Sequence, residues 1–271
     1  MLCLSFFAVQ TVYAEEPELP LWELGVGGGG FSMPQYMGSD ERYNYPIAFP
    51  YIIYRGDFFR IDRGGIRGRL FDTDRISLDL SFGFGLPVRN TNTARSGMPA
   101  LRLTGQVGPQ LNVYLAEYGN HSWSMHLPVR DAINIRADQV GWLTEPKLRY
   151  AYDRPMNDGR FRTRIDVGAM IVSRRFNDTY YSVDPAYVRT GRPAYQAGRG
   201  LHSIFAKLRV SYPISRDIQL FSGVQVRDLG VGVVDNSPLV KSRTYTSVVG
   251  GLIWTLMRSD KSTRAEIEEE N

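Results

Sequence analysis

Hydrophobic and polar residues alternate with a period of two along most of the chain. The clearest run places Ile76, Leu78, Leu80, Phe82, Phe84 and Leu86 on one side and Ser77, Asp79, Ser81, Gly83 and Gly85 on the other. Such alternation is typical of a β-strand with one apolar face. The pattern predicts eleven strands, over residues 22–31, 45–54, 58–70, 76–88, 101–116, 122–136, 140–152, 161–172, 201–214, 218–229 and 245–256.

The predicted strands are long. Most span about 10 to 15 residues, whereas a strand of a soluble protein has about five or six, and this greater length crosses a bilayer at a tilt. Turn signals such as Asp72-Thr73-Asp74 and Asn157-Asp158-Gly159 separate the strands and indicate antiparallel hairpins. Lipid tolerates no unpaired strand edge, so we expect an all-β, antiparallel transmembrane β-barrel of the bacterial outer membrane. A large soluble all-β protein is the alternative.

Eleven strands are an odd number, whereas bacterial single-chain barrels have an even number. We expect Gly64-Gly65 to form a turn that divides segment 58–70 into two short strands, which gives twelve strands. Ten strands remain the alternative if the segment with Pro46 and Pro50 is not a full strand, because proline disfavours the interior of a sheet.

The ends of the chain differ from this pattern. Residues 1–14 are apolar, uncharged and too short to span a bilayer, which predicts a secretory signal peptide. The barrel is then expected over residues 15–257. Residues 258–271 are expected to form a polar, acidic tail in the periplasm, because the part after Arg258 carries a net charge of −3.

In a barrel the apolar rows face lipid and the polar rows face the lumen. The predicted inward positions hold only three carboxylates, Asp79, Glu145 and Asp166, whereas the cations are far more numerous. They are Arg102, Arg130, Arg136, Lys147, Arg149, Arg162, Arg164, Lys207, Arg209 and Arg227. Burying an unpaired charge is costly, so this excess indicates either a wet lumen braced by arginine or an anion-preferring pore.

Catalytic and metal chemistry have few candidates. The single cysteine, Cys3, excludes a multi-cysteine metal site, and only three histidines, His121, His126 and His202, are available. Ser122 and Ser124 lie close to His126 in sequence, but side chains two residues apart on a strand project in parallel, which is poor geometry for proton transfer. We therefore expect no catalytic, cofactor-binding or metal-binding residue and no enzyme activity. The dispersed cations also argue against nucleic-acid binding, although the sequence pI is about 9.1.

The longest segment outside the predicted strands is 173–200. It is rich in tyrosine and arginine, which are enriched at binding hot spots. The candidate contact residues are Arg174, Arg175, Tyr180, Tyr181, Tyr187, Arg189, Arg192 and Tyr195. We expect this loop either to bind a partner or to fold over the mouth of the barrel and pack on itself.

Several short motifs, taken in order, resemble one known family. They are Trp22-Glu23-Leu24-Gly25, Tyr36-x-Gly38-Ser39-Asp40, Pro50-Tyr51-x-x-Tyr54-Arg55-Gly56-Asp57-Phe58, Gly97-Met98-Pro99, Gly108-Pro109-x-Leu111, Phe176-Asn177-Asp178-x-Tyr180-Tyr181 and Asp235-x-Ser237-Pro238-Leu239-Val240. Nearly all of the chain after residue 14 resembles the MipA/OmpV outer-membrane proteins of Gram-negative bacteria. The polar segment after Leu256 departs from the family, whose last strand usually ends in an aromatic residue.

The resemblance implies an outer-membrane location and a role without catalysis. The founding member resembles a scaffold that joins a lytic transglycosylase to a bifunctional penicillin-binding protein, so periplasmic murein synthases and hydrolases are the expected partners beside outer-membrane lipid. Other members are regarded as porins or adhesins. A small anion-preferring diffusion pore and a surface adhesin that uses segment 173–200 are therefore the alternatives. The resemblance transfers no site residue and no cofactor.

Overall fold

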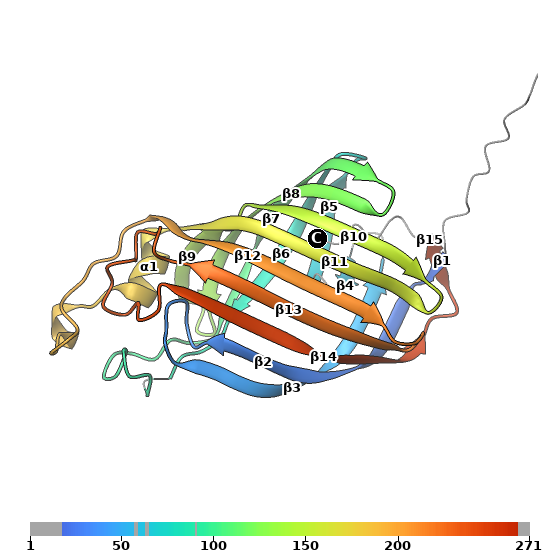
Figure 1. Cartoon of the computed structure of the whole chain (residues 1–271). Helices are drawn as coiled ribbons and strands as arrows, with labels where there is room; N and C mark the ends of the chain where they lie inside the picture. Colours follow the sequence, from blue (N-terminus) through green and yellow to red (C-terminus); the bar gives the residue numbers. More distant parts are fainter. Residues whose placement is uncertain (1–17, 57–58, 63–64, 90, 265–271) are drawn as a thin grey trace, which may run out of the picture.

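The computed structural model describes residues 18–56, 59–62, 65–89 and 91–264 (Figure 1). Thirteen of the described strands form one antiparallel sheet, and every predicted segment overlaps at least one of them. Their bounds are β2 Trp22–Pro34, β3 Arg42–Arg55, β4 Phe59–Asp62, β5 Gly65–Asp72, β6 Ile76–Gly85, β7 Thr104–Tyr118, β8 His121–Asn134, β9 Gln139–Thr144, β10 Lys147–Met156, β11 Gly159–Val172, β12 Gly200–Pro213, β13 Ile218–Asp228 and β14 Thr244–Arg258.

The sheet closes on itself. Neighbouring strands pair in chain order from β2 to β8, β8 pairs with both β9 and β10, and these two pair with β11. The ladder then continues through β12, β13 and β14 and returns to β2. Strands β9 and β10 run one after the other between β8 and β11, so together they occupy one position in the barrel wall. The strand is interrupted at Glu145 and Pro146 because proline cannot continue a ladder on both sides. The described barrel therefore has twelve wall positions, as predicted.

Strands β4 and β5 form a short hairpin, which confirms the predicted division of segment 58–70. The hairpin reaches β3 through only two residue pairs, Tyr54 with Ile61 and Arg55 with Arg60. On its other side, the hairpin pairs with the part of β6 from Ser77 to Ser81. Most of β3 and the last residues of β6 thus have no strand beside them on this side, among the residues that the structure describes.

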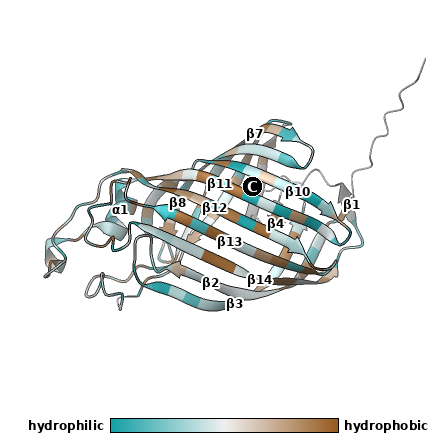
Figure 2. Ribbon diagram, in the orientation of Figure 1, coloured by the Kyte–Doolittle hydropathy of each residue, from teal (hydrophilic) through white to brown (hydrophobic). Residues whose placement is uncertain are grey.

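The outer surface of the barrel is apolar, as expected for a wall in lipid. Side chains such as Ile52, Leu127, Val224 and Trp254 are exposed on outward positions. Hydrophobic residues, brown in Figure 2, recur along β12, β13 and β14. No helix within the described ranges is long and apolar enough to cross a membrane.

The two ends of the barrel differ. One end, the loop end, carries the connections 35–41, 86–103, 173–199 and 229–243, together with helix α1 Arg174–Tyr181 and the short helix η1 Pro185–Tyr187. The other end, the turn end, has short turns and both ends of the described chain, where β1 Glu18–Pro20 pairs with β15 Ser262–Arg264 (Figure 1). This pairing within the predicted tail was not expected from the sequence. The predicted signal peptide lies outside the described residues.

Candidate functional site in the barrel lumen

One side of the lumen is apolar. Inward-facing side chains of β2, β3, β13 and β14 form this apolar wall, which consists of Phe31, Met33, Ile47, Phe49, Tyr51, Ile53, Phe221, Val249 and Ile253. The rings of Phe49 and Phe221 meet edge to face with centroids 6.0 Å apart. Gly27 leaves the space for this contact, because a Cβ there would lie 2.3 Å from the Phe49 ring. The expectation that only polar rows face the lumen is therefore wrong for this wall.

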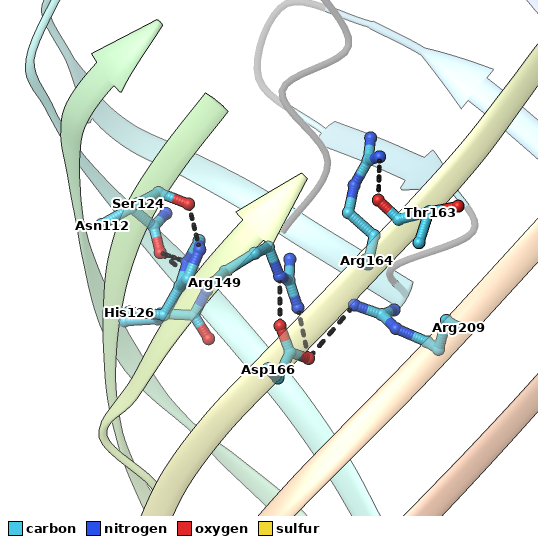
Figure 3. A network of polar contacts seen from close by, with 9 residues as sticks. Asn112, Ser124, His126, Arg149, Thr163, Arg164, Asp166 and Arg209 are labelled. Carbon is cyan, nitrogen blue, oxygen red and sulfur yellow. Dashed lines mark hydrogen bonds and ion pairs between the residues drawn. The ribbon is translucent and has the colours of Figure 1, made fainter. Parts of the chain in front are cut away.

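The opposite side of the lumen is cationic. Arg149, Arg162, Arg164, Lys207 and Arg209 form this cationic wall on β10, β11 and β12. Figure 3 shows Arg149, Arg164 and Arg209. Arg149 donates from Nε and Nη2 to the two oxygens of Asp166, at 2.6 and 3.0 Å, and Arg209 approaches the same carboxylate at 3.5 Å. Asp153, which the sequence analysis did not count among the inward carboxylates, binds both terminal nitrogens of Arg164 at 2.8 Å.

A second ion cluster surrounds Glu145, at the break between β9 and β10. Its carboxylate accepts a 2.7 Å hydrogen bond from Arg227 and lies 3.9 Å from Arg130. Arg227 also donates to Ser203 and stacks over the ring of Phe205, 4.8 Å from its centroid. These contacts satisfy a buried charge from several sides, which fits the bracing role expected of arginine.

Eight of the ten predicted lumen cations lie on strands of the wall, and two do not. Arg102 lies in the loop before β7, 3.8 Å from Asp138, and Arg136 is exposed in the turn after β8. The prediction that these two face the lumen is wrong, because β7 begins later and β8 ends earlier than the alternation suggests. Within the described ranges, neither Lys147 nor Lys207 has a carboxylate at salt-bridge distance.

A polar relay crosses β7 and β8 beside the cationic wall (Figure 3). Ser124 Oγ lies 2.8 Å from His126 Nε2, and His126 Nδ1 lies 2.8 Å from Asn112 Oδ1. The amide oxygen of Asn112 can only accept, so Nδ1 of the imidazole donates, and Nε2 of the neutral ring accepts from Ser124. Asn112 is held in turn by Ser77 and Asp79. Parallel projection of Ser124 and His126 was expected to give poor geometry for proton transfer, but the two side chains lie within hydrogen-bond distance because the buried imidazole turns back along its own strand.

This relay has the order of a nucleophile, a base and an orienting group. Ser124 also lines a pocket of about 470 Å³ at the turn end, the turn-end pocket, together with Ser122, Asp153 and Arg164. Hydrolysis of an ester additionally needs donors aimed at the developing oxyanion. The backbone of Ser124 pairs with β7 and β10, and Arg149 opposite it is held by Asp166. Within the described chain, Ser124, His126 and Asn112 thus form a hydrogen-bonded polar core.

The loop end is filled by a hydrophobic cap. Phe176, Tyr180 and Tyr181 of α1 pack against inward residues of the wall, among them Leu143 and Val172. The remaining cap residues come from the same segment, three other loops and neighbouring strands, namely Tyr36, Val88, Leu101, Ala132, Val140, Met170, Ala197, Leu229, Val234 and Tyr245. Segment 173–199 thus folds over the mouth, which is one of the two outcomes expected from the sequence.

The candidate contact residues of this segment divide into two groups. Arg174, Arg175 and Arg189 are exposed, and Tyr187 and Tyr195 are half-buried. Tyr180, Tyr181 and Arg192 are buried, so the prediction that they contact a partner directly is wrong. Arg192 instead donates to the carbonyl oxygens of Tyr187, Ala94 and Ser96 and joins two loops.

Tyrosine hydroxyls connect the cap to the strands. Tyr36 donates to the Leu239 carbonyl at 2.7 Å, and Tyr181 donates to the Met37 carbonyl at 2.9 Å. Burial raises the pKa of Tyr36 and of Tyr181, because it penalises the charged phenolate. His202 contacts the Tyr181 hydroxyl at 2.9 Å and is fully buried, although the alternation along its strand places it on the same row as exposed Ile204. The register shift between Met170 and Ile171 on the neighbouring strand accounts for this change of face.

The described residues include no group of three or more His, Cys, Asp or Glu side chains that could hold a metal ion. Among the described residues, the lumen presents fixed cations, a polar relay and an apolar wall.

A family model described as MltA-interacting protein MipA matches residues 26–256. Among solved structures, the chain is similar to the NanC porin, with 10% identity, a TM-score of 0.39 and coverage of 86% of this chain and 100% of that one. It is also similar to outer membrane phospholipase A from Escherichia coli, with 10% identity, a TM-score of 0.30 and coverage of 88% and 94%. A comparison with curated proteins finds no match.

Proposed function

Because the chain belongs to the MltA-interacting protein MipA family, we propose that this outer-membrane β-barrel is a non-catalytic scaffold for periplasmic murein enzymes. The observation that carries the proposal is the contrast between the two ends of the barrel. The loop end is filled by the hydrophobic cap, whereas the turn end keeps an open pocket and both ends of the described chain. Short turns face the periplasm in such barrels, so the periplasmic side offers the docking surface.

Affinity capture tests this scaffold role. The tagged protein, purified from a detergent extract of cells, is expected to retain murein synthases or hydrolases. Three exposed arginines at the turn end, Arg75, Arg154 and Arg216, are changed together to glutamate. This charge reversal is expected to reduce the recovery of murein enzymes. The matched control reverses Arg174, Arg175 and Arg199, which are exposed at the loop end. Capture without any murein enzyme, or an equal loss with both triple variants, would count against the scaffold.

The non-catalytic part of the proposal has its own test. A serine nucleophile activated by a histidine reacts with fluorophosphonates, whereas a buried serine without donors for the developing oxyanion does not. We expect no labelling of Ser124 in the folded barrel. Ser122→Ala, a serine variant elsewhere on β8, is the control. Labelling that persists in Ser122→Ala but disappears in His126→Ala would indicate that the protein is a hydrolase.

The cationic wall supports a second candidate, the small anion-preferring pore. The cap argues against it, because a hydrophobic core occupies the loop end. Planar-bilayer recordings separate the two functions: a steady anion-selective current would favour the pore, and the scaffold predicts none. The adhesin alternative rests on the exposed arginines of segment 173–199, and unchanged surface attachment after their replacement would remove it.

A further inference from the structure

The barrel wall has a lateral opening between β3 and β6, which we call the window. In the described chain, β3 pairs with the β4–β5 hairpin only at Tyr54 and Arg55, so no described strand lies along this edge of β3 from Arg42 to Pro50. On the other side, β6 pairs with β5 up to Ser81, so no described strand lies beside Phe82 to Gly85 there.

Other contacts frame this window. At the loop end, the Tyr43 hydroxyl donates to the Pro87 carbonyl at 2.7 Å and joins β3 to the loop after β6. At the turn end, the hairpin bridges the two strands. Pro46 and Pro50 lie on the open strand, and proline is found in sheets almost only on edge strands because it has no N–H to donate. The prolines, the short hairpin and the loop contact are independent observations that agree on one opening.

A cavity of about 1030 Å³ lies behind the window. It is at the upper limit of the roughly 300–1,000 Å³ typical of ligand pockets. Its lining includes the apolar wall and, across the lumen, Lys207, Arg209, Arg162 and Arg164 of the cationic wall. Phe84 lines the same cavity although it is 75% exposed on the outward face of β6. The cavity therefore communicates with the lipid-facing surface through the window.

The two walls select the chemistry of the occupant. The apolar wall accepts a hydrocarbon chain, because burying apolar surface there removes it from water. The cationic wall attracts an anionic group, and Lys207 has no carboxylate at salt-bridge distance among the described residues. We propose that this cavity binds an anionic amphiphile from the membrane, with its chain on the apolar wall and its head group beside Lys207 and Arg209. The inference does not depend on the scaffold role, which concerns the periplasmic end.

Native mass spectrometry of the full barrel in a neutral detergent tests the proposal. The probes are 1-palmitoyl-lysophosphatidylglycerol, which is anionic, lysophosphatidylcholine with the same chain, and glycerol 3-phosphate without a chain. The anionic lysolipid is expected to bind at least about tenfold more tightly than the zwitterionic one, as one charge-assisted contact allows. Equal binding of both lysolipids would overturn the proposal. Equal binding of glycerol 3-phosphate would also overturn it, since the site would then be a water-accessible anion site.

Matched lysine variants locate the site. Lys207→Gln is expected to weaken binding of the anionic lysolipid about tenfold, because it removes a charged contact in the cavity. Lys147→Gln is the control, since Lys147 also lacks a carboxylate at salt-bridge distance but does not line this cavity. Each variant must show the heat-modifiable gel shift of the folded barrel. An equal effect of both variants, or no effect of Lys207→Gln, would contradict the proposed position of the head group.

Discussion

Tyr181 is the central side chain of the cap, and its replacement should open the loop end. The side chain is fully buried. Its hydroxyl donates to the Met37 carbonyl at 2.9 Å and lies 2.9 Å from His202 Nε2, while its carbonyl accepts from Ser237 at 2.7 Å. One residue thus joins α1 to the loop after β2, to β12 and to the loop after β13.

Two substitutions separate these contributions. Tyr181→Phe keeps the ring but leaves the Met37 carbonyl and His202 without their partner, which costs about 1–3 kcal/mol. Tyr181→Ala also removes the ring and leaves a cavity, which costs about 3–5 kcal/mol. Helix α1 has only eight residues, and a helix this short is not stable without packing. The alanine variant is therefore expected to release α1 from the mouth while the barrel remains closed.

Trypsin and planar-bilayer recordings measure this release. Arg174, Arg175 and Arg189 provide exposed cleavage sites in segment 173–199. Cleavage there should be fastest in Tyr181→Ala, intermediate in Tyr181→Phe and slowest in the original protein, and only the alanine variant should conduct ions. Tyr187→Ala, in the same segment but half-buried, is the control and should behave like the original protein. If Tyr181→Ala neither conducts nor is cleaved faster, the cap does not depend on this residue and our account of the closed loop end is wrong.

Three other predictions concern the lumen and the cap. Asp166→Asn removes the carboxylate that Arg149 and Arg209 share and should destabilise the barrel by about 3–5 kcal/mol in urea unfolding. A loss below about 1 kcal/mol would contradict this. Gly27→Val should cost about 1–3 kcal/mol because its side chain would overlap the Phe49 ring, whereas outward-facing Gly28→Val, the control, should cost little. Burial raises the pKa of Tyr36 and Tyr181 above the usual value of about 10, so the cap should be fully stable below pH ~10 and lose stability as the pH rises further. The ultraviolet absorbance of tyrosinate and the rate of tryptic cleavage should therefore rise together. A cleavage rate that stays unchanged up to full ionisation of the tyrosines would contradict this prediction.

The wall of the barrel could be predicted from the sequence because a strand repeats every two residues. Alternation located all the long strands, and Gly64-Gly65 located the β4–β5 turn. The break at Glu145 and Pro146 was less visible, because the alternation continues across it on the same face. Local signals of this kind need no knowledge of the neighbouring strand.

The contents of the barrel could not be predicted in the same way. The cap joins residues that are far apart in sequence, such as Tyr36 and Leu239, and no period connects them. Helix α1 is too short for a helical pattern to show. The relay between Ser124 and His126 depends on side-chain rotamers, which the alternation of a strand does not specify. Asp153 was missed as a partner of Arg164 because the predicted strand ended one residue before it.

For strand β3, the sequence was compatible with a wall of either ten or twelve strands. Its inward row contains Ile47, Phe49 and Tyr51, and its outward row contains Ala48, Pro50 and Ile52, so both faces are apolar and alternation does not indicate which faces the lumen. The two prolines of this segment suggested a wall of ten strands, since they disfavour a strand with neighbours on both sides. The structure keeps all fourteen residues of β3 in one strand, which pairs with β2 from Arg42 to Tyr54. The prolines are compatible with this strand because the edge of β3 that faces away from β2 pairs with almost no described strand. The same two residues that argued against β3 as a full strand therefore mark the edge of the window.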